Sequence, residues 1–432
     1  MMQSGAQGVI NRLISGVNVA EITVSATLML LVFVNASYQF NVISPLFYHA
    51  VHMVSLACLG LLIVWFCISQ VDKITLFGIL LICGTAVLFL LNEILFPETT
   101  DEARRVFVRF ALYCLPLVVV ASQIESVEVL YRMLRKCTVV AVLVVVLLLL
   151  FRFSVTARIQ QQTYSMGLGY ALLPFALIAF NEFMREGLSL SVKIMFGLYG
   201  LIISSGIVIL GSRGPLVCIG CYFVLTILRW IVHGRRPLLI VIILLLLATM
   251  LLSYRVVLGF AVQVLSMGGF SRTGYLLEQF LQTGEIHLSG RDELQAPLFD
   301  EVLDDPFAIR GIAADRVFAG MNAHNLLLEV AFCFGLLALA LLVVFLLVYF
   351  VRCLKVPIGR YGDLIVIFFS ASVPSLMYSG SLWDNMIFWI GTAITFFALC
   401  SRQGFGGRSS ACVAPACEIY PLEGARIDKD LK

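Results

Sequence analysis

The sequence predicts an all-α, polytopic integral membrane protein with about twelve transmembrane helices. Its 432 residues are 61% apolar and only 13% charged, whereas soluble domains carry about 25% charged residues. Aliphatic runs such as 139–150 and 238–252 recur along the chain, and with their flanks most come near the ~20 residues that cross a bilayer as a helix. The buried helices of a soluble protein would instead show amphipathic stripes.

The apolar stretches place these spans in order along the chain. The first is expected to be retained, because one basic residue, Arg12, precedes it without a clean small-residue cleavage site. The spans form one transmembrane domain over residues 1–400, and the Gly/Ser-rich and then polar tail at 401–432 is predicted to be flexible. We expect spans at 19–37, 50–69, 74–92, 106–122, 137–153, 163–181, 194–210, 215–231, 237–254, 325–350, 362–379 and 383–400.

The lysines and arginines predict the orientation of the spans. If the N-terminus is cytoplasmic, 18 of the 29 Lys and Arg residues fall in cytoplasmic loops, span ends or the tail. The outer loops and span ends carry ten, five of them in the long loop at 255–323, and Arg109 lies within the fourth span. Because positive residues accumulate on the cytoplasmic side, we expect both termini inside and the long loop outside.

The loop at 255–323 is the one sizeable hydrophilic piece before the tail. Within it, 254–267 is amphipathic enough to lie at the membrane interface, and 291–303 is predicted to form a short helix. Its acidic residues are expected to form a solvated face. A metal site built from Asp304 and Asp305 is the alternative, and we expect neither a metal nor another cofactor.

The twelve cysteines do not indicate a disulfide framework. Most lie inside apolar segments, and the long outer loop holds none. Cys412 and Cys417 form a single C-x4-C pair in the tail, which is a poor zinc signal without a second pair.

Two outward-facing turns each present an arginine. The sequence Gly-Ser-Arg-Gly-Pro at 211–215 predicts a tight turn, with Pro215 well suited to the first position of a helix and Arg213 held by a short link. The sequence Ser-Gly-Arg-Asp at 289–292 presents Arg291 near a helix start. Each has a simpler interpretation: Arg213 as a snorkelling side chain at a helix end, and Arg291 as surface charge.

A third polar feature closes the long loop. Met-Asn-Ala-His-Asn at 321–325 puts a histidine and two amides at the mouth of the apolar segment that follows. His324 alone would be interpreted as a capping or interface residue. Together with Arg213 and Arg291, it describes a site, since arginines bind phosphate oxygens as planar forks and a histidine exchanges protons near neutral pH. A lipid-linked diphosphate at the outer leaflet would meet all three.

At these positions the sequence resembles the O-antigen ligase and polymerase superfamily. His324-Asn325, nine residues and then Gly335 fit its pattern His-[Asn/Ser/Gln]-x9-Gly. The resemblance spans roughly residues 160–345. Further similar stretches are Asp-Pro-Phe at 305–307 with Arg-Gly at 310–311, Gly-Ser-Arg-Gly at 211–214, Ser-Gly-Arg at 289–291 and the segment 164–170. The chain departs from the family pattern at Ala338, where ligases often have Gly, Thr or Tyr, and at Gln295, near a position that is often aromatic.

The resemblance implies a metal-independent, inverting glycosyltransferase of the GT-C type in the bacterial inner membrane, with its active site facing the periplasm. The donor would be a glycan on undecaprenyl diphosphate, and the acceptor a glycan or lipid A–core. Arg213 and Arg291 would bind the diphosphate, and His324 would act as general base on the acceptor hydroxyl or orient it. Asn325 would shape the pocket. Membrane lipid and a chain-length regulator are the further partners expected, and no nucleic acid.

Other polar residues have open roles. Asp384 is a candidate to hold His324 or an arginine, although a helix N-terminus alone also accounts for it. Arg158 is a candidate to guide acidic substrate or a solvated residue. Glu329 lies inside a span, where an ionisable group is costly; a catalytic role and a partnership with a buried arginine such as Arg109 are both open. His49 and His52 are expected at the interface.

The competing functions differ in where they place polar groups. A transporter or flippase would place ionisable groups near the midplane around broken helices with repeat symmetry, whereas these clusters lie at the outer boundary. A membrane acyltransferase is a more distant alternative. Within the family, a polymerase extends a lipid-linked chain and a ligase moves the finished glycan onto lipid A–core. The segment 164–170 and Ala338 favour the polymerase, with the ligase as alternative.

Overall fold

The protein is helical throughout the part of the chain that the computed structural model describes. The described residues are 19–38, 45–69, 76–154, 166–235 except 211, scattered positions between 237 and 282, and 291–396. All regular elements in these ranges are helices, which confirms the all-α prediction. Nine helices there are long and apolar enough to cross a membrane, as in a polytopic membrane protein. The expected span at 237–254, the interface segment at 254–267 and the tail lie outside the described residues or are described only at isolated positions.

The helices follow the expected order, with some shifted ends. The fourth span begins earlier than expected, because Pro97–Ser122 is one helical stretch with a π turn at its centre. The last helix is described only to Phe396. The elements are α2 (Val19–Tyr38), α3 (Pro45–Ser69), α4 (Leu76–Leu95), η2 (Pro97–Thr99), α5 (Thr100–Arg109), η3 (Phe110–Cys114), α6 (Leu115–Ser122), α7 (Val127–Ser154), α9 (Met166–Met184), α10 (Leu190–Ile209), α11 (Arg213–Val232), α15 (Arg291–Asp304), α16 (Ala314–Ala319), α17 (Leu326–Lys355), α18 (Arg360–Tyr378), η4 (Leu382–Asp384) and α19 (Met386–Phe396).

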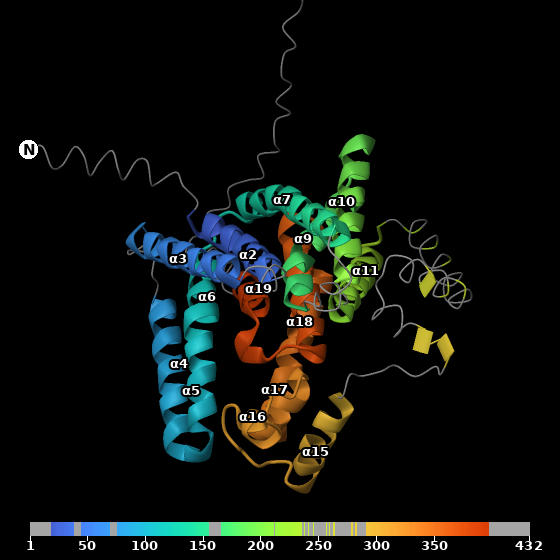
Figure 1. Cartoon of the computed structure of the whole chain (residues 1–432). Helices are drawn as coiled ribbons and strands as arrows, with labels where there is room; N and C mark the ends of the chain where they lie inside the picture. Colours follow the sequence, from blue (N-terminus) through green and yellow to red (C-terminus); the bar gives the residue numbers. More distant parts are fainter. Residues whose placement is uncertain are drawn as a thin grey trace, which may run out of the picture.

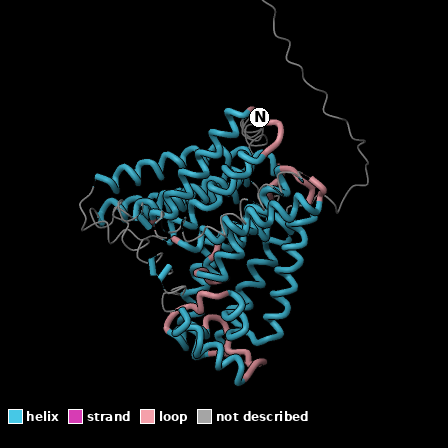
Figure 2. Tube along the Cα trace, turned by 90° about the vertical axis from the view of Figure 1, so that its right-hand side faces the viewer, coloured by secondary structure: helices cyan, strands magenta, loops and turns pink. Residues whose placement is uncertain are grey.

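Helices α9 and α18 form the centre of the bundle. Their membrane-crossing windows are 72% and 78% buried, against 22–61% for the other seven. In Figure 1 they lie together with α11 and α19, with α2 and α7 across one end and the pair α4–α5 standing to one side. Figure 2 shows the same helices turned by 90° about the vertical axis. Since α9 and α18 run through the core, residues near their two ends belong to opposite ends of the bundle.

Helix α17 is broken at Gly335, within a segment that the sequence predicts as a continuous span. Gly335 has φ 77° and ψ 173°, a backbone conformation essentially confined to glycine. The break exposes backbone groups that the segment 305–311 satisfies. Arg310 and Gly311 donate their N–H groups to Cys333 O at 2.9 and 3.0 Å, and Leu336 donates its N–H to Pro306 O at 2.8 Å. The loop before the histidine is therefore fastened to the helix that follows it.

The predicted loop helix at 291–303 is confirmed as α15. It packs against α16 and the first half of α17 in a small apolar cluster that includes Leu298, Val302 and Phe332. Arg310 closes this cluster, because its Nη2 donates to Glu301 O at 2.9 Å and its guanidinium lies 4.9 Å from the Phe332 ring centre. The loop helices and the start of α17 thus form one packed unit, seen at the bottom of Figure 1.

Candidate functional site

His324 lies in the short segment between α16 and α17. Its backbone is left-handed, with φ 52°, which is uncommon for a residue with a side chain and is found at strained functional positions. The ring Nδ1 lies 3.3 Å from Ser379 O, at the end of α18. Since a carbonyl oxygen only accepts, Nδ1 carries the proton in this contact, and the other ring nitrogen, Nε2, is an acceptor when the ring is neutral.

A cavity of about 400 Å³ opens beside His324. It lies between the start of α9, the end of α18, the start of α19 and the His324 segment, with α2 on one side. Its wall combines hydrogen-bonding groups with a few apolar side chains. The polar residues are Asn35, Tyr170, Asn322, His324, Ser375, Ser379, Ser381, Asp384 and Asn385, and the apolar ones Leu31, Ala171, Met386 and Ile387. Of the described residues that line it, none is a lysine or arginine.

The surroundings of His324 favour its neutral form. Burial lowers the pKa of His324 below its ordinary value, because desolvation penalises the imidazolium. The hydrogen bond to Ser379 O and the negative charge of Asp315 oppose this effect, while the positive charges of Arg291 and Arg316 lower the pKa of His324 further. A neutral imidazole with Nδ1–H held by a carbonyl is the state in which Nε2 can take a proton.

Side chains bond both backbone groups of Ala323, the residue before His324. Ala323 donates its N–H to Asp315 Oδ2 at 2.8 Å, and its carbonyl accepts from Gln295 Nε2 at 2.9 Å. Ala323 and the Asp315 carboxylate are both fully buried. These bonds join α15, which also carries Arg291, and α16 to the strained segment at His324. Gln295 therefore has a structural function here.

We expect Gln295→Leu to destabilise the protein without abolishing folding, because Ala323 O loses its donor while the volume at position 295 is nearly kept. A lost neutral hydrogen bond that leaves a buried acceptor costs about 1–3 kcal/mol. The check is the unfolding temperature in detergent of Gln295→Leu beside Gln295→Glu, which places an oxygen where the donor was and should be destabilised at least as much. Wild-type unfolding temperatures in both variants would contradict the role.

Asn325 is a helix cap and not a wall of the cavity. Its side-chain Oδ1 accepts the N–H groups of Leu327 and Leu328 at 3.0 and 3.3 Å, satisfying two of the orphan donors at the start of α17. The role of Asn325 in shaping the pocket stays a prediction. Its neighbour Asn322 is the amide that lines the cavity.

Residues 212–215, the described part of the predicted turn, pack directly against α9. A Cβ at Gly169 would lie 2.7 Å from the Ser212 side chain, and a Cβ at Gly214 would overlap the Tyr170 hydroxyl. Tyr170 in turn shares a short hydrogen bond with Ser379 Oγ, whose backbone oxygen receives Nδ1–H of His324. Arg213 is exposed at the start of α11. The residues on either side of it contact α9 at Gly169 and Tyr170, and Tyr170 and His324 both bond to Ser379.

The structure describes some of the other predicted site residues and not others. Arg291 begins α15 and is half-buried, and its charge acts on His324 as described above. Arg158 lies outside the described residues, as do Tyr164 and Ser289. Asp304 and Asp305 are both exposed at the end of α15, and the described part of the chain contains no group of three or more His, Cys, Asp or Glu residues able to hold a metal ion.

Asp384 holds arginines, as one of its predicted roles required. Its Oδ2 lies 3.2 Å from Arg316 Nη2 and 3.8 Å from Arg109 Nη1. The Arg109 side chain is 58% exposed, so the expectation of a buried arginine at this position is wrong. Arg316 is 10% exposed and also donates to Ser381 Oγ at 3.1 Å. The Asp384 carboxylate in the cavity wall is thus held in place by the Arg316 guanidinium.

Glu329 is buried in the first turn of α17 but does not pair with Arg109. Its Oε1 accepts from Ser381 Oγ at 2.6 Å, and its Oε2 from the Leu382 N–H at 3.2 Å. It therefore anchors the link between α18 and α19, where Ser381 and Asp384 face the cavity. Through these two bonds it supports the cavity wall. His49 is exposed in α3, as expected for an interface residue, and the side chain of His52 is not among the described ones.

Sequence reasoning missed Arg316, Asp315, Ser379 and the amides Asn35 and Asn385. A local signal existed for the first two, since Asp-Arg occupies 315–316, shortly before the histidine. The other three are ordinary polar residues in or beside spans, and only the packing of α2, α18 and α19 brings them to the cavity. No family model matches the chain, and no characterised protein or solved structure is significantly similar to it.

Proposed function

We propose that the protein is a membrane glycosyltransferase that moves a glycan from undecaprenyl diphosphate to a sugar hydroxyl at the periplasmic face of the bacterial inner membrane. The observation that carries this proposal is His324, whose Nδ1 is bonded to Ser379 O so that Nε2 is the available acceptor beside a cavity of sugar-binding residue types. Amides, hydroxyls and a carboxylate bind sugar hydroxyls through directional hydrogen bonds.

In the proposed reaction, an acceptor hydroxyl in the cavity gives its proton to His324 Nε2. The hydroxyl oxygen attacks the anomeric carbon of the donor sugar from the face opposite the phosphate, and the bond from that carbon to the phosphate oxygen breaks. The glycosidic bond forms with inversion, and lipid diphosphate leaves with its negative charge. No metal or cofactor takes part in these steps.

Arg213 and Arg291 are proposed to bind the departing diphosphate. Both have charged heads that are at least partly accessible, and guanidinium forks match phosphate oxygens. Neither arginine lines the cavity. We therefore propose that the cavity binds the acceptor sugar and that the two arginines bind the diphosphate of the donor. Such preorganised donors act mainly on the charge that develops at the transition state.

The proposal is tested by transfer from a purified undecaprenyl-diphosphate glycan in excess chelator. We expect Arg213→Ala and Arg291→Ala each to lower kcat/KM by about 10²–10³-fold, the cost of removing one transition-state donor. Arg132→Ala is the matched control, because Arg132 is a 62% exposed arginine of α7; its activity should equal that of wild type. Metal dependence, or full activity in either site variant, would contradict the assignment.

The more specific proposal is a repeat-unit polymerase of surface polysaccharide, with O-antigen ligase as the alternative. Both use the same donor chemistry, so a deletion strain separates them. Lipopolysaccharide carrying a single repeat identifies a polymerase, whereas bare core with accumulating lipid-linked polymer identifies a ligase.

A further inference from the structure

A second cavity lies at the opposite end of the bundle from His324. The first cavity is lined by Tyr170 near the start of α9 and Ser375 near the end of α18, whereas the second is lined by Arg185 after the end of α9 and Asp363 in the first turn of α18. It has a volume of about 190 Å³. By the charge bias of the sequence, this is the cytoplasmic end, where α11 also finishes.

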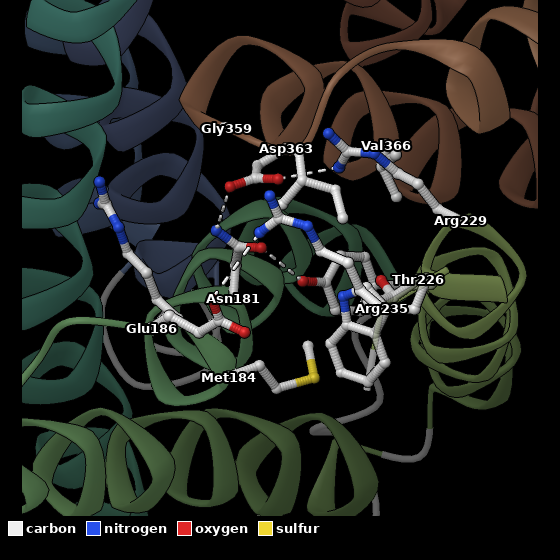
Figure 3. Close-up of a pocket in the computed structure, with 13 residues that line it drawn as sticks. Asn181, Met184, Glu186, Thr226, Arg229, Arg235, Gly359, Asp363 and Val366 are labelled. Atoms are coloured by element: carbon white, nitrogen blue, oxygen red, sulfur yellow. Dashed lines mark hydrogen bonds and ion pairs between the residues drawn. The ribbon is translucent and has the colours of Figure 1, made fainter. Parts of the chain in front are cut away.

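A buried arginine forms the inner wall of this cavity. The Arg229 side chain is 6% exposed, and its Nη1 lies 2.8 Å from Asp363 Oδ1. Its Nε donates to Val356 O at 3.1 Å, and its Nη2 makes a short hydrogen bond to Pro357 O. Figure 3 shows Arg229 and Asp363 beside each other, with Asn181 bonded to the second oxygen of the carboxylate. A guanidinium has five N–H donors, and these bonds use three.

A second arginine is carried to the mouth of the cavity by the way α11 ends. Gly234 is left-handed with φ 61°; its N–H donates to Ile231 O at 3.0 Å, and the N–H of Arg235 donates to Trp230 O at 2.8 Å. These are the two hydrogen bonds of a Schellman motif, which turns the chain back after a helix. Trp230, which is buried, and Arg235 therefore line the same cavity.

The ion pair at the mouth of the cavity is exposed to solvent, whereas the pairs behind its wall share a buried carboxylate. Arg235 lies 3.7 Å from Glu186, and both side chains are more than half exposed. Such a pair contributes little in water, so a stronger anion can replace it. At the wall, Glu182 is fully buried and lies within 2.9 Å of Arg185 and 3.3 Å of Arg135, so one carboxylate serves two guanidinium groups.

The charges of the lining residues leave an excess of positive charge. Three arginines line the cavity, Arg185, Arg229 and Arg235, against two carboxylates, Glu186 and Asp363. Arg135 and Glu182 lie directly behind the wall. Their charges cancel, so the excess stays at one positive charge. An anion of single charge, with several acceptor oxygens, would balance this set and use the remaining guanidinium donors.

We propose that this cavity binds the phosphate group of an anionic phospholipid in the cytoplasmic leaflet. Basic pockets between transmembrane helices on the cytoplasmic side bind such headgroups. The exposed apolar residues Ile231 and Val232 at the end of α11 would lie beside the acyl chains, and the volume is enough for a phosphodiester with part of its glycerol. Binding there joins the ends of α9, α11 and α18, and it does not depend on the transfer reaction.

The test is lipid binding by the full chain, purified in detergent and depleted of lipid. Native mass spectrometry measures the dissociation constants of phosphatidylglycerol and of phosphatidylcholine with the same acyl chains. Wild type should bind phosphatidylglycerol more tightly than phosphatidylcholine, and Arg235→Gln should weaken phosphatidylglycerol binding by about five- to tenfold. Arg235→Lys, which keeps the charge, should retain most of the preference.

Arg132→Gln is the matched control, since Arg132 is similarly exposed and lies 3.6 Å from Glu128. It should bind both lipids as wild type does. A parallel titration with inorganic phosphate identifies the source of the anion: binding that depends on Arg235 without lipid assigns the cavity to free phosphate, and binding by the lipid alone assigns it to the headgroup. Equal affinities for the two lipids, or equal losses in Arg235→Gln and Arg132→Gln, would overturn the proposal.

Discussion

His324→Ala is expected to abolish measurable glycan transfer while leaving the protein folded. The side chain is half-buried beside the cavity and makes one hydrogen bond, to Ser379 O, so its removal costs little packing. A positioned general base contributes about 10²–10⁴-fold to rate, and the loss should appear in kcat. The measurement is the initial rate of transfer, with elution volume and thermal unfolding of the variant compared with wild type. Activity within a factor of two of wild type would remove His324 from the mechanism.

If His324 is the general base, as proposed, it should also set the acid limb of the pH profile. The folded protein holds the pKa of His324 below its ordinary value, first through burial and then through Arg291 and Arg316. Because the base works only when neutral, activity should be flat around pH 7 and fall as pH drops through that lowered pKa. Removing the charge at position 316 with Arg316→Gln should move the midpoint of the limb toward higher pH. An unchanged midpoint would show that these charges do not act on the catalytic group.

Gly335→Ala is expected to destabilise the protein strongly. Gly335 has positive φ inside α17, and a Cβ there would lie 3.1 Å from Phe307 O and 3.2 Å from Ala308 O. These atoms are backbone and cannot move aside without breaking the contacts of the segment 305–311. The unfavourable backbone conformation alone costs about 1–3 kcal/mol. The lowering of the unfolding temperature in detergent measures the effect, and transfer activity should fall with it because the loop before His324 loses its attachment.

Gly220→Ala is the matched control for this prediction. Gly220 also lies inside a membrane-crossing helix, α11, but no atom lies within 4 Å of where its Cβ would be. Its replacement should leave the unfolding temperature unchanged or slightly higher, since alanine is the better helix former. Equal behaviour of the two variants would contradict the structural role of the break.

Composition and local polarity predict much of this fold. Long apolar runs give the helices, and polar residues that interrupt them are few enough that His324 and Arg213 stand out directly. The turn at 211–214 and the loop helix beginning at Arg291 follow from glycines and from a short amphipathic run. These features are local in sequence, which is why periodicity and spacing find them.

The remainder depends on contacts between distant segments. Gly335 looks like one more small residue in an apolar run, and only the docking of residues 305–311 shows that it breaks α17. Asp384 could have held several partners, and the arginine it holds most closely, Arg316, comes from 68 residues earlier in the chain. Arg109 looks buried because its neighbours are apolar, yet more than half of its side chain is exposed. Such pairings come from packing, which a single sequence does not specify.

The most direct test is a structure of the protein with a non-hydrolysable undecaprenyl-diphosphate glycan and an acceptor sugar bound. We predict an acceptor hydroxyl oxygen in the cavity about 3 Å from His324 Nε2, with the diphosphate contacting Arg213 and Arg291. An acceptor bound elsewhere, or a diphosphate far from both arginines while the cavity holds no sugar, would contradict it.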